Sequence, residues 1–180
     1  PELPDQKKER FIKDYSLNAY EANVLVSDKE ISDYFEEVVK TSDIKLAKNW
    51  IPGDLFASLN DKNISISESP IKAKEMASLI NTISSGLISG RAAKEVFEVM
   101  KDSGGDPVEI IEKKGLKQKS DPKELEILID RILDENKDKV AEYKSGKDKL
   151  FGFFVGQSMK ASGGTANPKL VNDILKKKLK

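Results

Sequence analysis

The stretch DPKELEILIDRIL, residues 121–133, contains both the start signal and the periodicity of an amphipathic helix. An aspartate side chain accepts hydrogen bonds from the free N–H groups of a helix start, and proline fits the first helical position, where no donor is needed. Apolar residues follow at the spacing that lines up one face of a helix: Leu125, Leu128, Ile129, Ile132 and Leu133. This segment therefore predicts a helix that packs one apolar face against other helices.

The same signals recur along most of the chain. Another apolar stripe with helical spacing is formed by Ile31, Tyr34, Phe35, Val38 and Val39. Further helix starts are predicted at Ser69-Pro70, Asp106-Pro107 and Asn167-Pro168, and at the capping box Ser27-x-x-Glu30. The one strand-like stretch, residues 63–67, is short and lies among polar residues. We therefore expect an all-α fold of about ten helices.

A break in the helical pattern divides the chain. Residues 102–120 contain the sequence Asp-Ser-Gly-Gly-Asp-Pro at their start and a second glycine-containing polar stretch before Asp121. The break predicts a multi-helix domain over residues 1–110 and a smaller tail domain of three or four helices over residues 111–180.

The composition excludes several kinds of chemistry. The 180 residues include neither cysteine nor histidine, which removes disulfides, thiolate nucleophiles, the commonest general base and the usual zinc ligand. There is no phosphate-binding loop or dinucleotide-binding glycine motif. The uncharged stretches are too short to cross a bilayer, and the start, Pro-Glu-Leu-Pro, has no signal peptide. We expect a cytoplasmic chain without a membrane partner, and an independent enzyme is disfavoured.

Charge is unevenly distributed although the net charge is zero. From Lys144 onward there are nine lysines and only two acidic residues, Asp148 and Asp173. A basic end of this kind suits a polyanionic partner such as a nucleic acid. The alternative is a solvated lysine-rich tail, and charge alone favours this alternative.

Two glycines stand in the predicted helix of the segment GFFVGQSMKASGGTANP, residues 152–168. Gly152 and Gly156 are one turn apart, although each glycine costs a helix roughly 1 kcal/mol relative to alanine. The favoured explanation is tight helix–helix packing inside the tail domain. The functional alternative is the close approach of a sugar–phosphate backbone, aided by Lys147, Lys149 and Lys160.

A possible phosphate-binding end follows these glycines. The turn at Gly163-Gly164 is able to point backbone N–H groups at an anion, and the helix start at Asn167-Pro168-Lys169 adds a positive dipole end beside a lysine. Elsewhere, Trp50 is interpreted as a core anchor in preference to a stacking platform. Arg91 is interpreted as an exposed side chain in preference to a phosphate ligand.

The tail carries a family resemblance. GKDKLFGFFVGQSMKASGGTANPKLVNDILKKKL, residues 146–179, resembles the closing signature of the GatB/YqeY family, in which Val-Gly-Gln-x-Met-Lys is followed by a glycine turn and Ala-Asn-Pro. Three upstream stretches are also similar to family members that are amidotransferase B subunits: PELPDQKKERFIKDYSLNAYEANVL, LAKNWI and GLISGRAAKEVFEVM. The likeness spans essentially the whole chain. One departure is Ser162-Gly163-Gly164, where the family often has Thr-Lys-Gly.

The resemblance implies a role in making Gln-tRNA(Gln) or Asn-tRNA(Asn) from the misacylated forms. Family members use ATP and magnesium in a catalytic cradle, which this chain lacks, and they work with the A and C subunits of the amidotransferase. The resemblance therefore implies a chain that is non-catalytic, holds no cofactor and binds tRNA. The tRNA-binding residues that we expect are Lys147, Lys149, Gly152, Gly156, Gln157, Lys160, Gly163, Gly164, Asn167 and Lys169. The alternative is a protein-interaction module that docks on a partner subunit or a synthetase.

Overall fold

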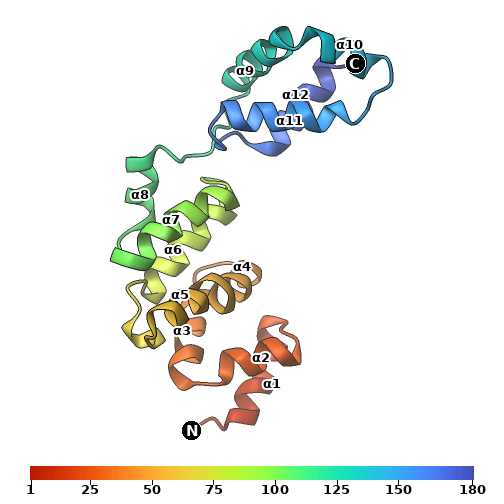
Figure 1. Cartoon of the computed structure of the whole chain (residues 1–180). Coiled ribbons are helices and arrows are strands. Elements are labelled where there is room, and N and C mark those ends of the chain that lie inside the picture. The colour runs from red at the N-terminus through yellow and green to blue at the C-terminus, as the bar shows by residue number, and fades with distance from the viewer. The chain divides into compact units, whose positions relative to one another are not determined.

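A computed structural model describes all residues from Pro1 to Lys180 and consists of helices joined by turns (Figure 1). The only strand-type pairing is a single bridge between Lys119 and Ala166. The all-α prediction is thus confirmed. The helices of the first two thirds are α1 (Pro4–Tyr15), α2 (Ala19–Val26), α3 (Lys29–Val39), α4 (Ile44–Trp50), α5 (Phe56–Lys62), α6 (Ala73–Ser84), α7 (Gly90–Ser103) and α8 (Pro107–Lys114). They are followed by α9 (Pro122–Glu135), α10 (Lys137–Lys144), α11 (Leu150–Ala161) and α12 (Pro168–Lys178).

The chain forms two compact units. The first unit contains residues 1–85 and 94–113, and the second contains residues 86–93 and 114–180. The expected change of domain near residue 110 lies close to the change at residue 113. Nothing in the sequence pattern indicated that residues 86–93, which include the first turn of α7, group with the second unit.

Aromatic side chains anchor the core of the first unit. Phe11 of α1 and Phe35 of α3 are fully buried, and their ring centroids lie 5.7 Å apart. The Trp50 ring lies 5.6 Å from that of Phe97, and only 7% of this tryptophan is exposed. Trp50 is therefore a core anchor, as expected. Between α4 and α5, residues Ile51–Leu55 form one π-helical turn that continues the helix through Pro52.

Most predicted helix starts are correct, and two are displaced. Asp121 and Asn167 cap α9 and α12 with their side chains, and α8 begins at Pro107. At the predicted Ser69-Pro70 start, α6 begins only at Ala73, because the Ser69 hydroxyl accepts the N–H of Ile71 and holds these residues in a turn. The expected capping box at Ser27 is also wrong: Asp28 caps α3. The strand-like residues 63–67 lie in a loop that includes a short 3₁₀ turn, Ile66–Glu68.

A half-buried tyrosine makes the first unit sensitive to alkali. The Tyr34 hydroxyl donates to the Ile71 carbonyl at 2.9 Å, and burial together with the nearby Glu75 raises the pKa of Tyr34 far above its usual value. Because the pKa of Tyr34 is higher in the folded protein than in the unfolded chain, where it is about 10, the protonated tyrosine stabilises the fold below pH 10. This stabilisation is lost as the pH rises above about 10. At pH 7, Tyr34→Phe should cost about 1 kcal/mol, because the carbonyl loses its donor. Denaturant unfolding followed by Trp50 fluorescence should show this difference shrinking between pH 9 and pH 11; a constant difference would contradict the assignment.

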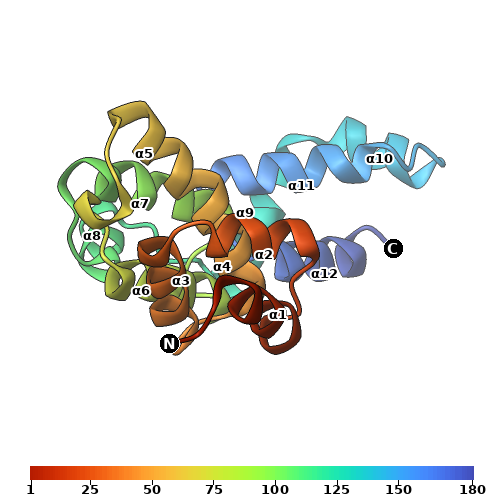
Figure 2. The ribbon, with the colours of Figure 1, turned by 90° about the horizontal axis from the view of Figure 1, so that it is seen from below.

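The second unit is built around a three-helix bundle. Helices α9, α11 and α12 pack against one another, and α10 packs against α9 and α11. Both views show α11 beside α12 (Figure 1, Figure 2). The buried core consists of Leu125, Ile129, Ile132, Phe154, Ala166, Val171, Leu175 and Leu179. None of the twelve α-helices has the length and apolar character that a bilayer crossing requires.

Candidate functional site

The solvent face of α11 carries most of the predicted site. Phe154 and Ser158 are fully buried on the core side of this helix. The opposite face exposes Lys149, just before the helix, and then Gly152, Gly156 and Lys160 at helical spacing. We call these four residues the glycine stripe. It is a strip of bare backbone with one lysine at each end, and Gln157, which is half-buried, lies on its flank.

The two glycines of the stripe pack against nothing in the second unit. A Cβ atom placed on Gly152 or on Gly156 would meet no atom within 4 Å. The favoured explanation for these glycines, tight packing inside the tail domain, is therefore wrong. The bundle contacts α11 through its Phe154 face, so the roughly 1 kcal/mol that each glycine costs the helix is not offset within this unit.

The glycine turn after α11 caps the helix. Gly163 and Gly164 have φ angles of +65° and +78°, which glycine adopts without strain. The Gly163 N–H donates to the Lys160 carbonyl at 3.0 Å, and the Gly164 N–H donates to the Met159 carbonyl at 2.8 Å. These are the two bonds of a Schellman motif. The expectation that this turn points free N–H groups at an anion is therefore wrong, because both donors are already used.

The N–H groups at the start of α12 also have partners already. The Asn167 side chain accepts from the N–H groups of Lys169 and Leu170, at 3.1 and 3.4 Å. The backbone of Asn167 also pairs with residue 119, since its N–H donates to the Lys119 carbonyl at 2.9 Å. Asn167 thus holds the helix start in place. The exposed Lys169 side chain remains available to a ligand.

The predicted lysines differ in how free their charge is. Lys147 forms an ion pair with Glu142 at 2.8 Å, and its ammonium group holds the pKa of that carboxyl below its usual range. Lys149, Lys160 and Lys169 are exposed and form no ion pair within the second unit. These three lysines are the ones that present an unneutralised charge.

Arg91 is a neighbour of the turn that the sequence did not assign to the site. A Cβ on Gly164 would lie 3.8 Å from the Arg91 Nη1 atom and 3.9 Å from its Cδ atom, so the side chain runs over the glycine turn. Arg91 is exposed and belongs to the second unit. Only the fold brings it to this turn. In the sequence, Arg91 lies in the family-like stretch GLISGRAAKEVFEVM and was weighed as a phosphate ligand, but nothing there linked it to the glycine turn.

The two units have opposite charge. The second unit contains 17 lysines and arginines and 10 acidic residues, a net charge of +7. The first unit contains 14 basic and 21 acidic residues, a net charge of −7. All of this basic excess lies in residues 144–180, because the rest of the second unit carries eight basic and eight acidic side chains. A polyanion is therefore attracted to this C-terminal part of the second unit and repelled by the first unit.

Comparison with known proteins gives one consistent result. A family model described as the GatB domain matches residues 33–179. The curated relatives include three bacterial proteins, each named as the B subunit of an aspartyl/glutamyl-tRNA(Asn/Gln) amidotransferase. The Pelagibacter ubique protein is 63% identical, and those of Ehrlichia ruminantium and Thioalkalivibrio sulfidiphilus are each 51% identical.

Each of these alignments covers 99% of the chain but only 37–38% of the relative. The chain thus corresponds to somewhat more than a third of such a subunit. The family match extends over both units, and it contains the motif around α11 on which the resemblance rested. The chain belongs to the GatB family.

Proposed function

We propose that this chain is the non-catalytic tRNA-binding part of an amidotransferase B subunit, and that the second unit grips the tRNA. It would position misacylated Glu-tRNA(Gln) or Asp-tRNA(Asn) for conversion to the correctly charged form. The observation that carries this proposal is the glycine stripe: exposed helix backbone without a packing partner in the second unit, with a free lysine at each end.

The chemistry of the stripe suits a ribose–phosphate backbone. The missing side chains at Gly152 and Gly156 let a bulky strand lie directly on α11, while Lys149 and Lys160 stand where phosphates on either side would pass. Lys169 and Arg91 add positive charge on other elements of the same unit. Contacts of this kind recognise the shape of a folded RNA, since no aromatic sheet surface is present for stacking bases.

In this proposal the chain works in the cytoplasm as part of a complex with the A and C subunits. It holds the tRNA and no cofactor. The ATP- and magnesium-dependent activation of the side-chain carboxylate takes place elsewhere in the parent protein.

The second candidate function is docking of a protein partner on the same stripe. An open glycine face also admits a closely packed helix from another subunit or from a synthetase. Capture of cellular partners with and without nuclease treatment separates the two functions. Capture that survives nuclease favours a protein partner.

A double substitution in the stripe tests the proposal directly. In Gly152→Ala/Gly156→Ala, each added methyl has room, so the second unit should become more stable by roughly 0.5–1 kcal/mol per site. The same methyls hold an RNA backbone off the helix, and we expect tRNA to bind about tenfold more weakly, equivalent to ~1.4 kcal/mol. Thermal unfolding and a tRNA titration at low salt measure the two effects.

Two control variants accompany this test. Gly53→Ala adds a methyl at an equally open glycine in the first unit and should leave tRNA binding unchanged. Lys149→Ser/Lys160→Ser should weaken binding and lower the slope of log K against log salt by roughly two, because two phosphate contacts are lost. A Gly152→Ala/Gly156→Ala protein that binds tRNA as the parent does would refute the role of the stripe.

A further inference from the structure

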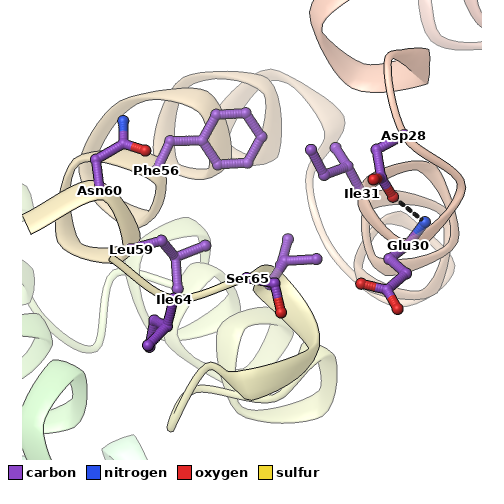
Figure 3. Close-up of a pocket in the computed structure, with 9 residues that line it drawn as sticks. Asp28, Glu30, Ile31, Phe56, Leu59, Asn60, Ile64 and Ser65 are labelled. Carbon is purple, nitrogen blue, oxygen red and sulfur yellow. Dashed lines mark hydrogen bonds between the residues drawn. The ribbon is translucent and has the colours of Figure 1, made fainter. Parts of the chain in front are cut away.

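The first unit contains a pocket that the proposed function does not use. Its apolar walls are formed by Ile31 of α3, Phe56 and Leu59 of α5, and Ile64 and Ile66 of the following loop (Figure 3). Its volume is about 240 Å³, below the roughly 300–1,000 Å³ of typical small-molecule sites. A space of this size suits one or two amino-acid side chains better than a nucleotide or a cofactor.

Two carboxylates form the edge of this pocket on the α3 side. Asp28 and Glu30 lie opposite Phe56 and Asn60 across the opening (Figure 3). The Asp28 side chain accepts the Glu30 N–H at 2.6 Å and so caps the start of α3. Both residues are exposed and bring two negative charges to the mouth of an apolar space.

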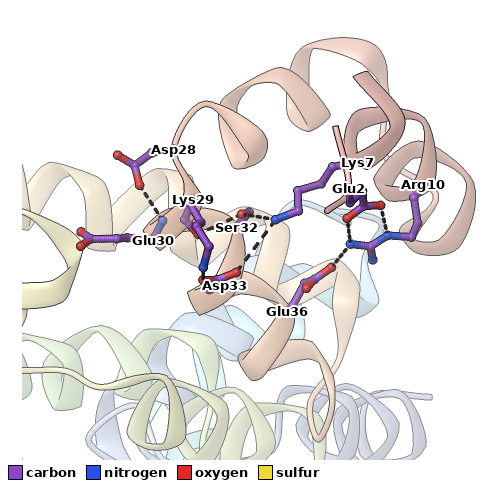
Figure 4. A network of polar contacts seen from close by, with 9 residues as sticks. All are labelled: Glu2, Lys7, Arg10, Asp28, Lys29, Glu30, Ser32, Asp33 and Glu36. Atoms are coloured by element: carbon purple, nitrogen blue, oxygen red, sulfur yellow. Dashed lines mark hydrogen bonds and ion pairs between the residues drawn. The ribbon is translucent and has the colours of Figure 1, made fainter. Parts of the chain in front are cut away.

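The nearby lysines do not neutralise this edge. Lys29 pairs with Asp33 at 2.6 Å, one turn further along α3. Lys7 donates to the Ser32 hydroxyl at 3.0 Å and lies 3.9 Å from the same Asp33 (Figure 4). Neither Asp28 nor Glu30 forms an ion pair, so their charge is available to a partner from outside the chain.

The apolar surface continues on the other side of α5. Phe56 and Asn60 also line a second hollow, which includes Val24 and Tyr20 of α2. Tyr20 is 77% exposed, which makes it one of the few large apolar side chains that the chain leaves in solvent. Exposed apolar groups gathered around neighbouring hollows are typical of protein-docking surfaces.

We propose that this pocket docks a basic, apolar segment of a partner protein: a bulky aliphatic side chain enters between Ile31 and Phe56, and an adjacent lysine or arginine pairs with Asp28 and Glu30. The charge of the first unit supports this occupant, because a net charge of −7 repels a polyanion and attracts a cationic chain. The inference does not depend on the tRNA contact of the second unit. It assigns a protein partner to the first unit, whereas the tRNA binds to the second.

Methyl NMR of the whole chain with labelled isoleucines tests this proposal. The probe is a five-residue peptide that alternates lysine with leucine. It should shift the methyl signals of Ile31 and Ile64 in a saturable way, and the signals of Ile80 and Ile129, which are buried elsewhere, should stay in place. A lysine–serine peptide and a glutamate–leucine peptide should bind at least about tenfold more weakly, since each lacks one of the two required properties.

Charge-removal variants complete the test. Asp28→Asn/Glu30→Gln keeps a capping residue at position 28 and should weaken binding of the lysine–leucine peptide about fivefold. The matched variant Glu9→Gln/Asp14→Asn removes two exposed charges from α1 and should leave it unchanged. Equal binding of all three peptides, equal loss in both variants, or movement of the Ile31 and Ile64 signals on addition of tRNA would each overturn the proposal.

Discussion

Phe154→Ala should strongly destabilise the second unit and leave the stability of the first unit unchanged. Phe154 is fully buried in the core of the bundle, where its ring lies 5.5 Å from that of Phe153 and 6.5 Å from that of Tyr143. Removing a buried phenylalanine ring costs about 3–5 kcal/mol. A unit of this size has roughly 4–11 kcal/mol of stability in total, so the variant loses a large part of it. Binding of tRNA should be lost at the lower denaturant concentration or temperature at which the variant's second unit unfolds.

The single tryptophan separates the two units in this experiment. Trp50 lies in the first unit, so its fluorescence follows that unit alone, whereas far-UV circular dichroism follows helices in both. We expect the fluorescence midpoint to stay in place and the dichroism curve to acquire an early transition. Phe154→Leu should cost much less, and Ile127→Ala, at a residue that is 67% exposed, should cost under about 0.5 kcal/mol. A common shift of both signals would show that the chain unfolds as one body.

Local signals in the sequence predicted the helices well. Asp121, Asn167 and the proline after each define a helix start through atoms only a few residues apart, and the structure has helices there. The Ser69-Pro70 start failed because two hydrogen bonds hold Ile71 in a turn: the nearby Ser69 hydroxyl accepts its N–H, and the distant Tyr34 hydroxyl donates to its carbonyl. Local sequence cannot reveal a partner that lies this far away along the chain.

The sequence named the residues of the candidate site but could not predict how they are oriented. Apolar residues occur on nearly every side of α11, including Phe151, Phe153 and Val155, so periodicity could not tell which face enters the core. The face that enters the core is decided by how α9 and α12 pack against α11, and this packing leaves Gly152 and Gly156 exposed. The approach of Arg91 to Gly164 depends on the same long-range packing. The sequence correctly predicted a turn at Gly163-Gly164. It did not show that the N–H groups of these glycines would donate to carbonyls at the end of α11.

Gly104→Ala should be the most damaging small substitution in the first unit. Gly104 follows the end of α7 with a φ of +67°, and its N–H donates to the Met100 carbonyl at 2.7 Å. An alanine Cβ there would lie 2.7 Å from the Pro70 carbonyl oxygen, a distance that real Cβ contacts do not reach. Because the obstacle is backbone, it cannot rotate aside.

Two costs therefore add in this variant. A left-handed conformation at a residue with a Cβ costs about 1–3 kcal/mol, and forcing the loop at Pro70 away costs a further ~1–3 kcal/mol. The melting midpoint of the first unit, followed by Trp50 fluorescence, should fall by roughly 10 °C or more. Gly115→Ala isolates the first cost, because Gly115 has a φ of +63° and no atom within 4 Å of an added Cβ. If Gly104→Ala cost its unit no more than Gly115→Ala costs the second unit, the close approach of Pro70 to Gly104 would be refuted.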